Sequence, residues 1–155
     1  MASYAKATDA RLVALGSRRT LERSTSPFTR ASCPMIKGIK FASIPVRDQD
    51  AALAFYTTRL GFTVATDQPF DESQRWIELR IPGADTRLVL FTPPAHADRI
   101  GTFSNITFLA DDVERTYQEL RAKGVEFTAP PKVQEWGTSV IMKDPDGNAF
   151  VISSK

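Results

Sequence analysis

Three charged residues, Glu78, Arg80 and Arg87, have the chemistry to transfer protons or to bind an acidic group. They lie in two stretches, 75–81 and 86–92, where every second residue belongs to a largely apolar set and the residues between hold the three charges. This alternation predicts strands with one face in the core and one face outside it. A carboxylate on the outer face can accept a proton, and an arginine there can hold a carboxylate or phosphate through its planar fork.

A short turn between the two strands would bring these charges onto one face. If Ile81 pairs with Thr86, Arg80 lies opposite Arg87, and Glu78 lies on the same face. Two opposed arginines destabilise a sheet by roughly a few tenths of a kcal/mol unless a negative group neutralises them. Glu78 can be that group in a structural ion-pair network, or a bound acidic molecule can take the role. The sequence leaves both interpretations open.

The same period of two places further residues on the predicted outer faces of the strands. These residues are aromatic, flexible and apolar, or small and polar. Such a lining suits an aromatic or conjugated small molecule that a few polar groups orient. Alternatively, the same residues fill a collapsed cavity or a dimer interface. With the two arginines, the candidate ligand-binding residues are Phe41, Trp76, Arg80, Arg87, Phe91, Asn105, Thr107, Met142 and Ser153.

The composition of the 155 residues, 42% hydrophobic and 25% charged, is typical of a soluble globular protein. No apolar run approaches the roughly 20 residues that cross a bilayer, so we expect no membrane-spanning segment. The single cysteine, Cys33, cannot form an internal disulfide, and we expect a reducing cytoplasmic location. The single histidine, His96, cannot build a multi-histidine metal site.

Charge divides the chain into a basic tail and a slightly acidic body. Residues 1–34 carry six basic and two acidic residues, a net charge of +4, whereas residues 35–155 carry 14 basic and 16 acidic residues, a net charge of −2. We expect 1–34 to be a disordered extension ahead of a natural start at Met35, with an Arg-rich transit peptide as the alternative. The acidic body argues against a nucleic-acid partner.

The body begins with a strand, a helix and three strands. Asp48 suits the N-cap of the helix and Gly61 its end, because aspartate accepts bonds from free amides and glycine adopts positive φ. The predicted strands are 36–46, 62–65, 75–81 and 86–92, and the predicted helix is 48–60. The order is β-α-β-β-β.

The same order recurs in the second half of the body. A strand at 104–109 precedes a helix that Asp111 or Asp112 caps and Gly124 closes. Strands follow at 125–128, 138–143 and 148–153. The helix caps, closing glycines and hairpin turns of the two halves lie 62 to 64 residues apart. A repeat of this length indicates duplicated units that pack together.

The two halves also carry short motifs in a fixed order: Phe55-Tyr56, Leu60-Gly61-Phe62, Gly124-Val125 and Asp144-Pro145-Asp146-Gly147-Asn148. Their order and spacing resemble the vicinal-oxygen-chelate superfamily of glyoxalases, bleomycin-resistance proteins and extradiol dioxygenases. The resemblance implies an α+β domain over 35–155, with βαβββ modules at about 36–92 and 104–154. It implies that the modules form a cup-shaped curved sheet with the helices outside, in a homodimer whose second subunit completes or flanks the cup.

Metal-dependent members of this superfamily place their ligands on cup-facing positions of the first and last strands of each module. The resemblance maps these positions to Phe41, Val89, Asn105 and Val151. Two valines, a phenylalanine and an amide offer few donors to a divalent cation. We therefore expect no metal and no cofactor, which removes the basis for glyoxalase I or extradiol dioxygenase chemistry.

The leading hypothesis is a metal-independent protein that sequesters a small aromatic or acidic molecule in its cup, as bleomycin-resistance proteins do. One alternative is a glyoxalase-like lyase or isomerase in which Glu78 transfers the proton and Arg80 or Arg87 stabilises negative charge. Another is an interaction domain without a small-molecule site. The sequence alone leaves open whether the protein is an enzyme.

The other candidate bases and nucleophiles have weaker support. His96 lies in the connection between the two halves and can act as a base only if that loop closes over the cup. A solvated loop histidine is the alternative. Cys33 lies in the basic tail without a base beside it, so nothing supports a nucleophilic thiol.

A chain that begins at Met35 should have the same melting temperature as the full chain, because residues 1–34 lack the apolar periodicity needed to join a core. Differential scanning calorimetry of both chains checks this expectation. A clearly lower melting temperature for the shorter chain would show that the extension packs on the body.

Overall fold

The computed structural model describes residues 36–92, 95 and 97–154. The N-terminal extension, Cys33 and His96 therefore lie outside the described residues. In the first module, β1 (Phe41–Pro45) leads to helix α1 (Gln49–Thr58), and three strands follow: β2 (Thr63–Pro69), β3 (Arg75–Arg80) and β4 (Arg87–Phe91). They form one sheet in the order β1-β4-β3-β2, with β1 parallel to β4 and the other pairs antiparallel.

The second module repeats this arrangement after a short 3₁₀ turn, η1 (Ala97–Arg99). Its elements are β5 (Phe103–Leu109), α2 (Val113–Ala122), β6 (Glu126–Phe127), β7 (Lys132–Gln134), β8 (Gly137–Lys143) and β9 (Ala149–Ser153). The sheet order is β5-β9-β8-β6, and β7 also pairs with β8. The sequence did not predict β7, because its three residues are exposed and too few to show a periodic pattern.

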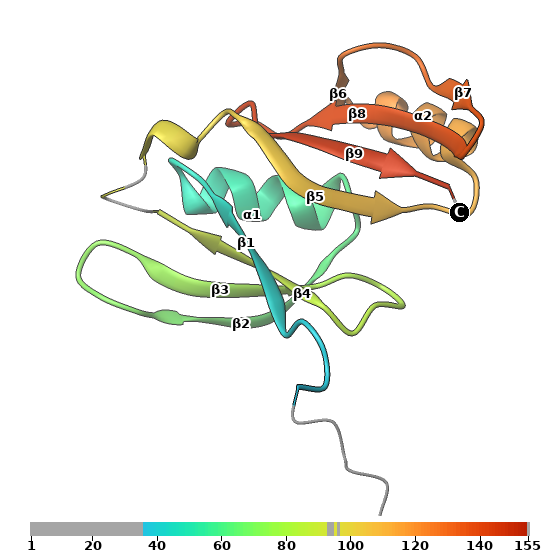
Figure 1. The fold of residues 1–155 in the computed structure, drawn as a ribbon. Helices are drawn as coiled ribbons and strands as arrows, with labels where there is room; N and C mark the ends of the chain where they lie inside the picture. The colour runs from blue at the N-terminus through green and yellow to red at the C-terminus, as the bar shows by residue number, and fades with distance from the viewer. Residues whose placement is uncertain (1–35, 93–94, 96, 155) are drawn as a thin grey trace, which may run out of the picture. The chain divides into compact units, whose positions relative to one another are not determined.

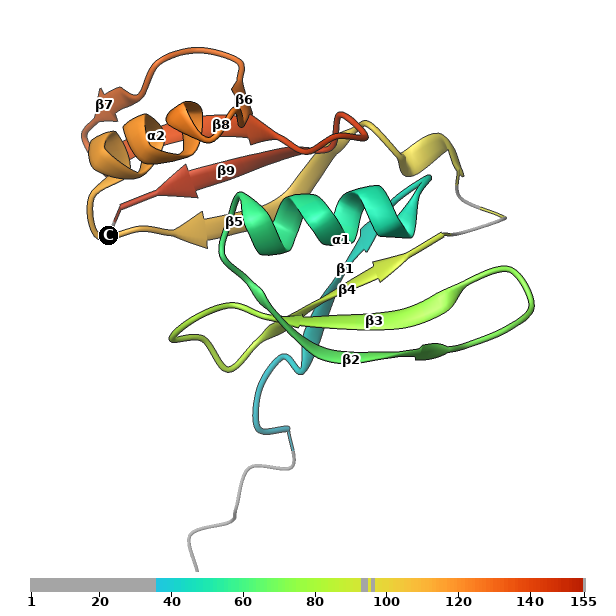
Figure 2. The same cartoon turned by 180° about the vertical axis from the view of Figure 1, so that it is seen from behind.

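The predicted α+β fold of two βαβββ modules is confirmed. Both helices lie on one side of the strands, behind them in Figure 1 and in front of them in Figure 2. The strands form two sheets rather than one continuous sheet, because β1 and β5 each pair with a neighbour on one side only. Among the described residues, no helix is both long and apolar enough to cross a membrane.

Each helix begins where the sequence predicts. The Asp48 carboxylate accepts hydrogen bonds from the backbone N–H groups of Asp50 and Ala51 at 2.9 and 3.1 Å. Asp112 caps α2 by accepting from the N–H of Arg115 at 2.9 Å. These bonds satisfy amides that the first turn of a helix leaves free.

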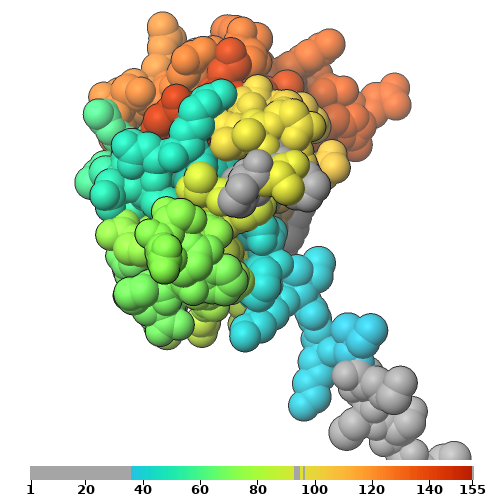
Figure 3. Space-filling model, turned by 90° about the vertical axis from the view of Figure 1, so that its left-hand side faces the viewer, coloured from blue at the N-terminus to red at the C-terminus, as the bar shows by residue number. Residues whose placement is uncertain are grey.

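The side chain of Gln49 ties the start of α1 to the first sheet. Its amide nitrogen donates to the carbonyl oxygens of Arg75 and Leu90 at 2.7 and 3.0 Å, and its amide oxygen accepts from the N–H of Arg75 at 2.8 Å. The start of α1 and the β2–β3 loop consequently lie side by side (Figure 3), with a polar hollow of about 550 Å³ between them.

One hydrophobic core joins both modules. The strand residues that the alternation assigns to the helix side, Ile77, Leu79, Leu88 and Leu90, are fully buried as predicted. Aromatic rings continue this core from α1 across to the second sheet. The centroid distances are 6.1 Å for Tyr56 to Phe62, 6.0 Å for Phe62 to Phe108 and 5.7 Å for Phe108 to Phe150.

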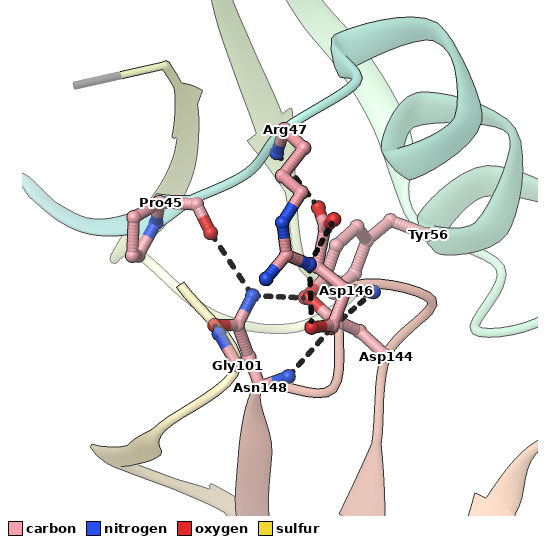
Figure 4. Close-up of polar contacts among 7 residues, drawn as sticks. All are labelled: Pro45, Arg47, Tyr56, Gly101, Asp144, Asp146 and Asn148. Carbon is pink, nitrogen blue, oxygen red and sulfur yellow. Dashed lines mark hydrogen bonds and ion pairs between the residues drawn. The ribbon is translucent and has the colours of Figure 1, made fainter. Parts of the chain in front are cut away.

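The β8–β9 turn fastens the second module to the first (Figure 4). The Tyr56 hydroxyl donates a hydrogen bond of 2.8 Å to Oδ2 of Asp144. Nδ2 of Asn148 donates to the same Oδ2 at 2.8 Å and to the carbonyl oxygen of Pro45 at 3.0 Å. Arg47 forms an ion pair with Asp146, with 3.2 Å between Nη1 and Oδ1. We call these contacts the polar junction.

Burial changes the pKa values of two groups in the polar junction. It raises the pKa of the Tyr56 hydroxyl far above its ordinary value of 10.0, and the nearby Asp144 carboxylate adds to this effect. Burial also raises the pKa of Asp144, while hydrogen bonds from Asn148 and Tyr56 oppose the rise. The hydroxyl therefore remains a donor at pH values where an exposed tyrosine ionises.

Replacing Tyr56 with phenylalanine should lower the free energy of unfolding by about 1–3 kcal/mol, because it removes a donor from a buried carboxylate. The pH dependence of the free energy of unfolding should also change. Above pH 10, the unfolded chain releases the tyrosine proton and the folded chain retains it, so wild-type stability falls as pH rises. The Y56F chain lacks this contribution. Urea unfolding between pH 7 and 11 measures both effects.

Tyr117→Phe is the matched control, because the Tyr117 hydroxyl accepts a bond of 3.2 Å from Arg121 on the same helix and contacts no buried carboxylate. Tyr117 is buried, but its partner Arg121 is exposed and can bond to water once the hydroxyl is removed, so this substitution should cost clearly less than Tyr56→Phe. Equal costs for the two variants would contradict the importance of the polar junction.

Candidate ligand-binding site

Each sheet has one face that the helices do not cover, and we call these the cup faces. In the first sheet, Arg80 lies opposite Arg87 and Glu78 opposite Val89, the register that the hairpin predicts. Phe41 is the neighbour of Arg87 on β1. The polar and aromatic candidates of β1, β3 and β4 therefore share one cup face.

Glu78 lies at the centre of this face and binds two of its neighbours. Its Oε1 accepts a hydrogen bond of 2.9 Å from Nε1 of Trp76, and its Oε2 lies 2.6 Å from Nη1 of Arg87. The Glu78 side chain is only 9% exposed, whereas that of Arg87 is 35% exposed. Both carboxylate oxygens thus have a donor, and part of the guanidinium still faces solvent.

These donors keep Glu78 ionised. The hydrogen bonds from Trp76 and Arg87 lower the pKa of the Glu78 carboxyl below its ordinary value, although desolvation opposes the shift. A general base works best when its pKa lies near the working pH. An ionised carboxylate with both oxygens engaged is better suited to orient Arg87 and Trp76 than to remove a proton.

Aromatic rings surround Trp76. The Phe41 ring meets the Trp76 ring edge-on with 5.4 Å between centroids, and Phe70 lies at 5.8 Å. The sequence analysis did not identify Phe70, which follows Pro69 at the end of β2 and is 63% exposed. A single aromatic residue in an otherwise polar loop could have drawn attention to Phe70. Its position beside Trp76, however, follows only from the pairing of β2 with β3.

The two arginines differ in their partners. Arg87 has its ion pair with Glu78, whereas no acidic side chain in the described part of the chain pairs with Arg80, which is exposed. Phe91 lies on the same strand as Arg87, is half-buried, and is the neighbour of Pro45. This cup face therefore combines aromatic surface with a guanidinium that a ligand can reach.

The remaining candidates lie on the second sheet. Asn105 and Thr107 are exposed on β5, and Ser153 is half-buried on β9 opposite Leu109. Within the described residues, no hydrogen bond connects these three side chains to Glu78 or its partners. A hollow of about 360 Å³ separates β1 from β5, and Ser43 and Asn105 line it from either side.

Met142 does not face the cup, so its predicted orientation is wrong. It is 1% exposed, lies opposite Phe150 and belongs to the core. The β8–β9 register puts Ile141 opposite Val151, which shifts the cup-facing set of β8 by one residue from the predicted one. Both alternating sets of β8 contain aliphatic residues, so hydrophobicity alone could not select the correct face.

The four positions to which the sequence resemblance maps the metal ligands hold Phe41, Val89, Asn105 and Val151. Only Asn105 contributes a donor atom from its side chain, and hard cations need several oxygens. Across the described ranges, no three or more His, Cys, Asp or Glu side chains cluster closely enough to hold a metal ion. The residues present do not fit a divalent metal at these positions.

Comparison with known proteins assigns the family. The model of the Glyoxalase/Bleomycin resistance protein/Dioxygenase superfamily matches residues 38–152. The chain belongs to this superfamily. Its curated relatives include the uncharacterized protein YetH of Bacillus subtilis (strain 168), which is 37% identical over 118 residues, 76% of this chain and 98% of YetH.

Solved structures of this superfamily are also similar to the chain. A superfamily member from Sphaerobacter thermophilus DSM 20745 has a TM-score of 0.72 and 34% identity, covering 78% of this chain and 99% of that one. TnmS3, an antibiotic binding protein from Streptomyces sp. CB03234, has a TM-score of 0.66 and 32% identity, covering 77% and 97% of the two chains.

Added Zn²⁺, Ni²⁺, Mn²⁺ or Fe²⁺ should neither bind at one ion per chain nor raise the melting temperature, because the superfamily ligand positions hold Phe41, Val89, Asn105 and Val151. An ion that binds only the native state would stabilise it. Isothermal titration calorimetry and thermal melts check this. Saturable one-to-one binding at micromolar metal would contradict the expectation and restore the metal-dependent chemistries.

Proposed function

We propose that the protein binds a small aromatic or acidic molecule on its cup faces without a metal and sequesters it. The cluster of Glu78, Trp76 and Arg87 carries this proposal. In it, a buried carboxylate fixes an indole ring beside a partly exposed guanidinium. Aromatic surface beside a cation suits a ligand with a flat ring and a negative group.

The state of Glu78 favours binding over proton transfer. In the lyase or isomerase alternative, Glu78 would need a free oxygen and a pKa close to the working pH. Instead, both oxygens accept hydrogen bonds, and the pKa of this carboxyl is lowered. The same contacts hold Arg87 in place before a ligand arrives, which reduces the entropy that binding must overcome.

One solved structure similar to the chain supports the binding of a small molecule. TnmS3 is described as an antibiotic binding protein, and it is 32% identical to this chain over nearly its whole length. We extend the binding of a small molecule, but not the identity of that molecule, to the present protein. The proposed contacts are Phe41, Trp76, Arg80, Arg87, Phe91, Asn105, Thr107 and Ser153.

The proposal includes a homodimer and a cytoplasmic location. Three large apolar side chains on or beside the cup faces, Phe70, Phe103 and Leu109, are 63%, 58% and 62% exposed. A second copy over these faces would remove that apolar surface from water and enclose the ligand. Without such a copy, the interaction-domain alternative would gain support.

Arg87→Ala should weaken binding of an anionic aromatic probe, 8-anilinonaphthalene-1-sulfonate, by about 1.5–3 kcal/mol, because it removes a charge-assisted hydrogen bond. Probe fluorescence and quenching of Trp76 measure this affinity. Arg115→Ala is the matched control, since Arg115 also pairs with a glutamate, at 2.8 Å, but lies on α2. Its affinity should equal that of the wild type.

Glu78→Gln distinguishes sequestration from catalysis, because glutamine still accepts a hydrogen bond from Trp76 but cannot act as a base. A sequestering protein should keep its affinity within about threefold, whereas an enzyme that uses Glu78 should keep binding and lose about 10²–10⁴ in rate. If Trp76→Phe and Arg87→Ala both leave binding unchanged in folded protein, the cup faces are not the site.

A further inference from the structure

A groove of about 780 Å³ lies between the modules, mainly on the helix-covered side, and it reaches the cup face of the second sheet at Thr107 and Leu109. Residues of the helix-covered side line it, including Phe62 and Leu88 of the first module and Phe108 and Leu120 of the second. The β3–β4 turn, residues 81–86, borders one side and α2 borders the other. We call this the α2 groove.

The internal repeat shows why the α2 groove exists. The repeat of 62 to 64 residues relates Tyr56 of α1 to Leu120 of α2, and the β8–β9 turn to the β3–β4 turn. In the polar junction, α1 reaches the β8–β9 turn through the bond from Tyr56 to Asp144. At the equivalent place, Leu120 has no polar atom to offer. Among the described residues, no hydrogen bond or ion pair joins α2 to residues 81–86.

The size and lining of the α2 groove suit a small molecule. Ligand sites commonly have volumes of about 300–1,000 Å³, with largely apolar walls and a few polar groups. Aromatic and aliphatic side chains form most of these walls, and Phe62 and Phe108 offer ring faces or edges for stacking. The groove is therefore an apolar counterpart to the arginine-containing cup face.

Charges at the border of the α2 groove indicate which molecules fit. Asp111 and Glu119 line the groove, and Lys123 is the only lysine or arginine among the described residues that line it. All three are exposed, and Glu119 pairs with Arg115 on the same helix. The border thus disfavours an anion, in contrast to the cup face with Arg80 and Arg87.

We propose that the α2 groove is a second ligand site, which binds a compact apolar molecule without negative charge. This inference does not depend on the proposed function, because most of the groove lining lies on the helix-covered side and its border carries the carboxylates of Asp111 and Glu119 instead of arginines. The two sites can therefore be distinguished by two fluorescent probes of similar size.

The neutral probe N-phenyl-1-naphthylamine should bind the full chain saturably at one molecule per chain, with a rise in fluorescence as it leaves water. Ala84→Trp should weaken this binding at least about tenfold, a clear loss of affinity, because the exposed Ala84 lines the groove and an indole there would fill it. Ala122→Trp is the matched control on α2, at an exposed position outside the lining.

A second variant tests whether the loss of binding in Ala84→Trp comes from filling the groove and not from a change in the β3–β4 turn. Lys123 of the C-terminal end of α2 lines the groove and is exposed, so Lys123→Trp should fold and should also weaken the neutral probe. Circular dichroism melts of every variant establish that the fold is intact. Arg87→Ala should leave the neutral probe unaffected while weakening 8-anilinonaphthalene-1-sulfonate.

Three results would overturn the inference. The neutral probe binds nowhere, or it binds equally to wild type and both groove variants, or Arg87→Ala rather than Ala84→Trp weakens it. The last result would assign the probe to the cup face. If Arg87→Ala leaves the affinity for 8-anilinonaphthalene-1-sulfonate unchanged and the neutral probe behaves as expected, the proposed function is contradicted. The inference about the α2 groove is then unaffected.

Discussion

The carboxylate of Asp144 organises the contact between the two modules. Its Oδ1 accepts hydrogen bonds from the backbone N–H groups of Asp146 and Asn148 at 3.0 and 2.9 Å, which shape the β8–β9 turn. Its Oδ2 accepts from Tyr56 and from the Asn148 side chain. A buried charge is costly unless donors surround it, and here four donors do so.

The connection between the modules must approach this turn closely. Gly101 donates its backbone N–H to Oδ1 of Asn148 at 2.8 Å, and it adopts a φ of +80°. A Cβ at this position would come within 3.0 Å of the carbonyl oxygen of Asp146. Only glycine combines that conformation with that approach, so the polar junction constrains the backbone of both modules as well as their side chains.

The sequence predicted the fold well because several local signals agreed. Asp48 and Gly61, together with their equivalents in the repeat, marked the ends of both helices. A period of two assigned β3 and β4 to the correct faces, because Glu78, Arg80 and Arg87 mark the outer face of these strands. The alternation failed at β8, where aliphatic residues occur on both faces and only pairing with β9 decides the register. It also could not reveal Phe70, whose ring reaches Trp76 through the loop between β2 and β3.

Duplication produced two junctions with different physical properties. The one at Asp144 is polar and closed, and the one at Leu120 is apolar and open. A polar junction fixes geometry, since its hydrogen bonds have directions, whereas an apolar groove tolerates varied shapes. The protein thus combines a rigid attachment at one end of its core with an adaptable surface at the other.

Parallel pairing of the first and last strands of each module has a consequence for biosynthesis. β1 joins β4, and β5 joins β9, so each sheet closes only after its final strand has been made. Such long-range pairing is slow, and modules usually fold as units on the ribosome. Asp144 follows Tyr56 by 88 residues, so the Tyr56 hydroxyl of the first module has no partner until the β8–β9 turn of the second module has been made.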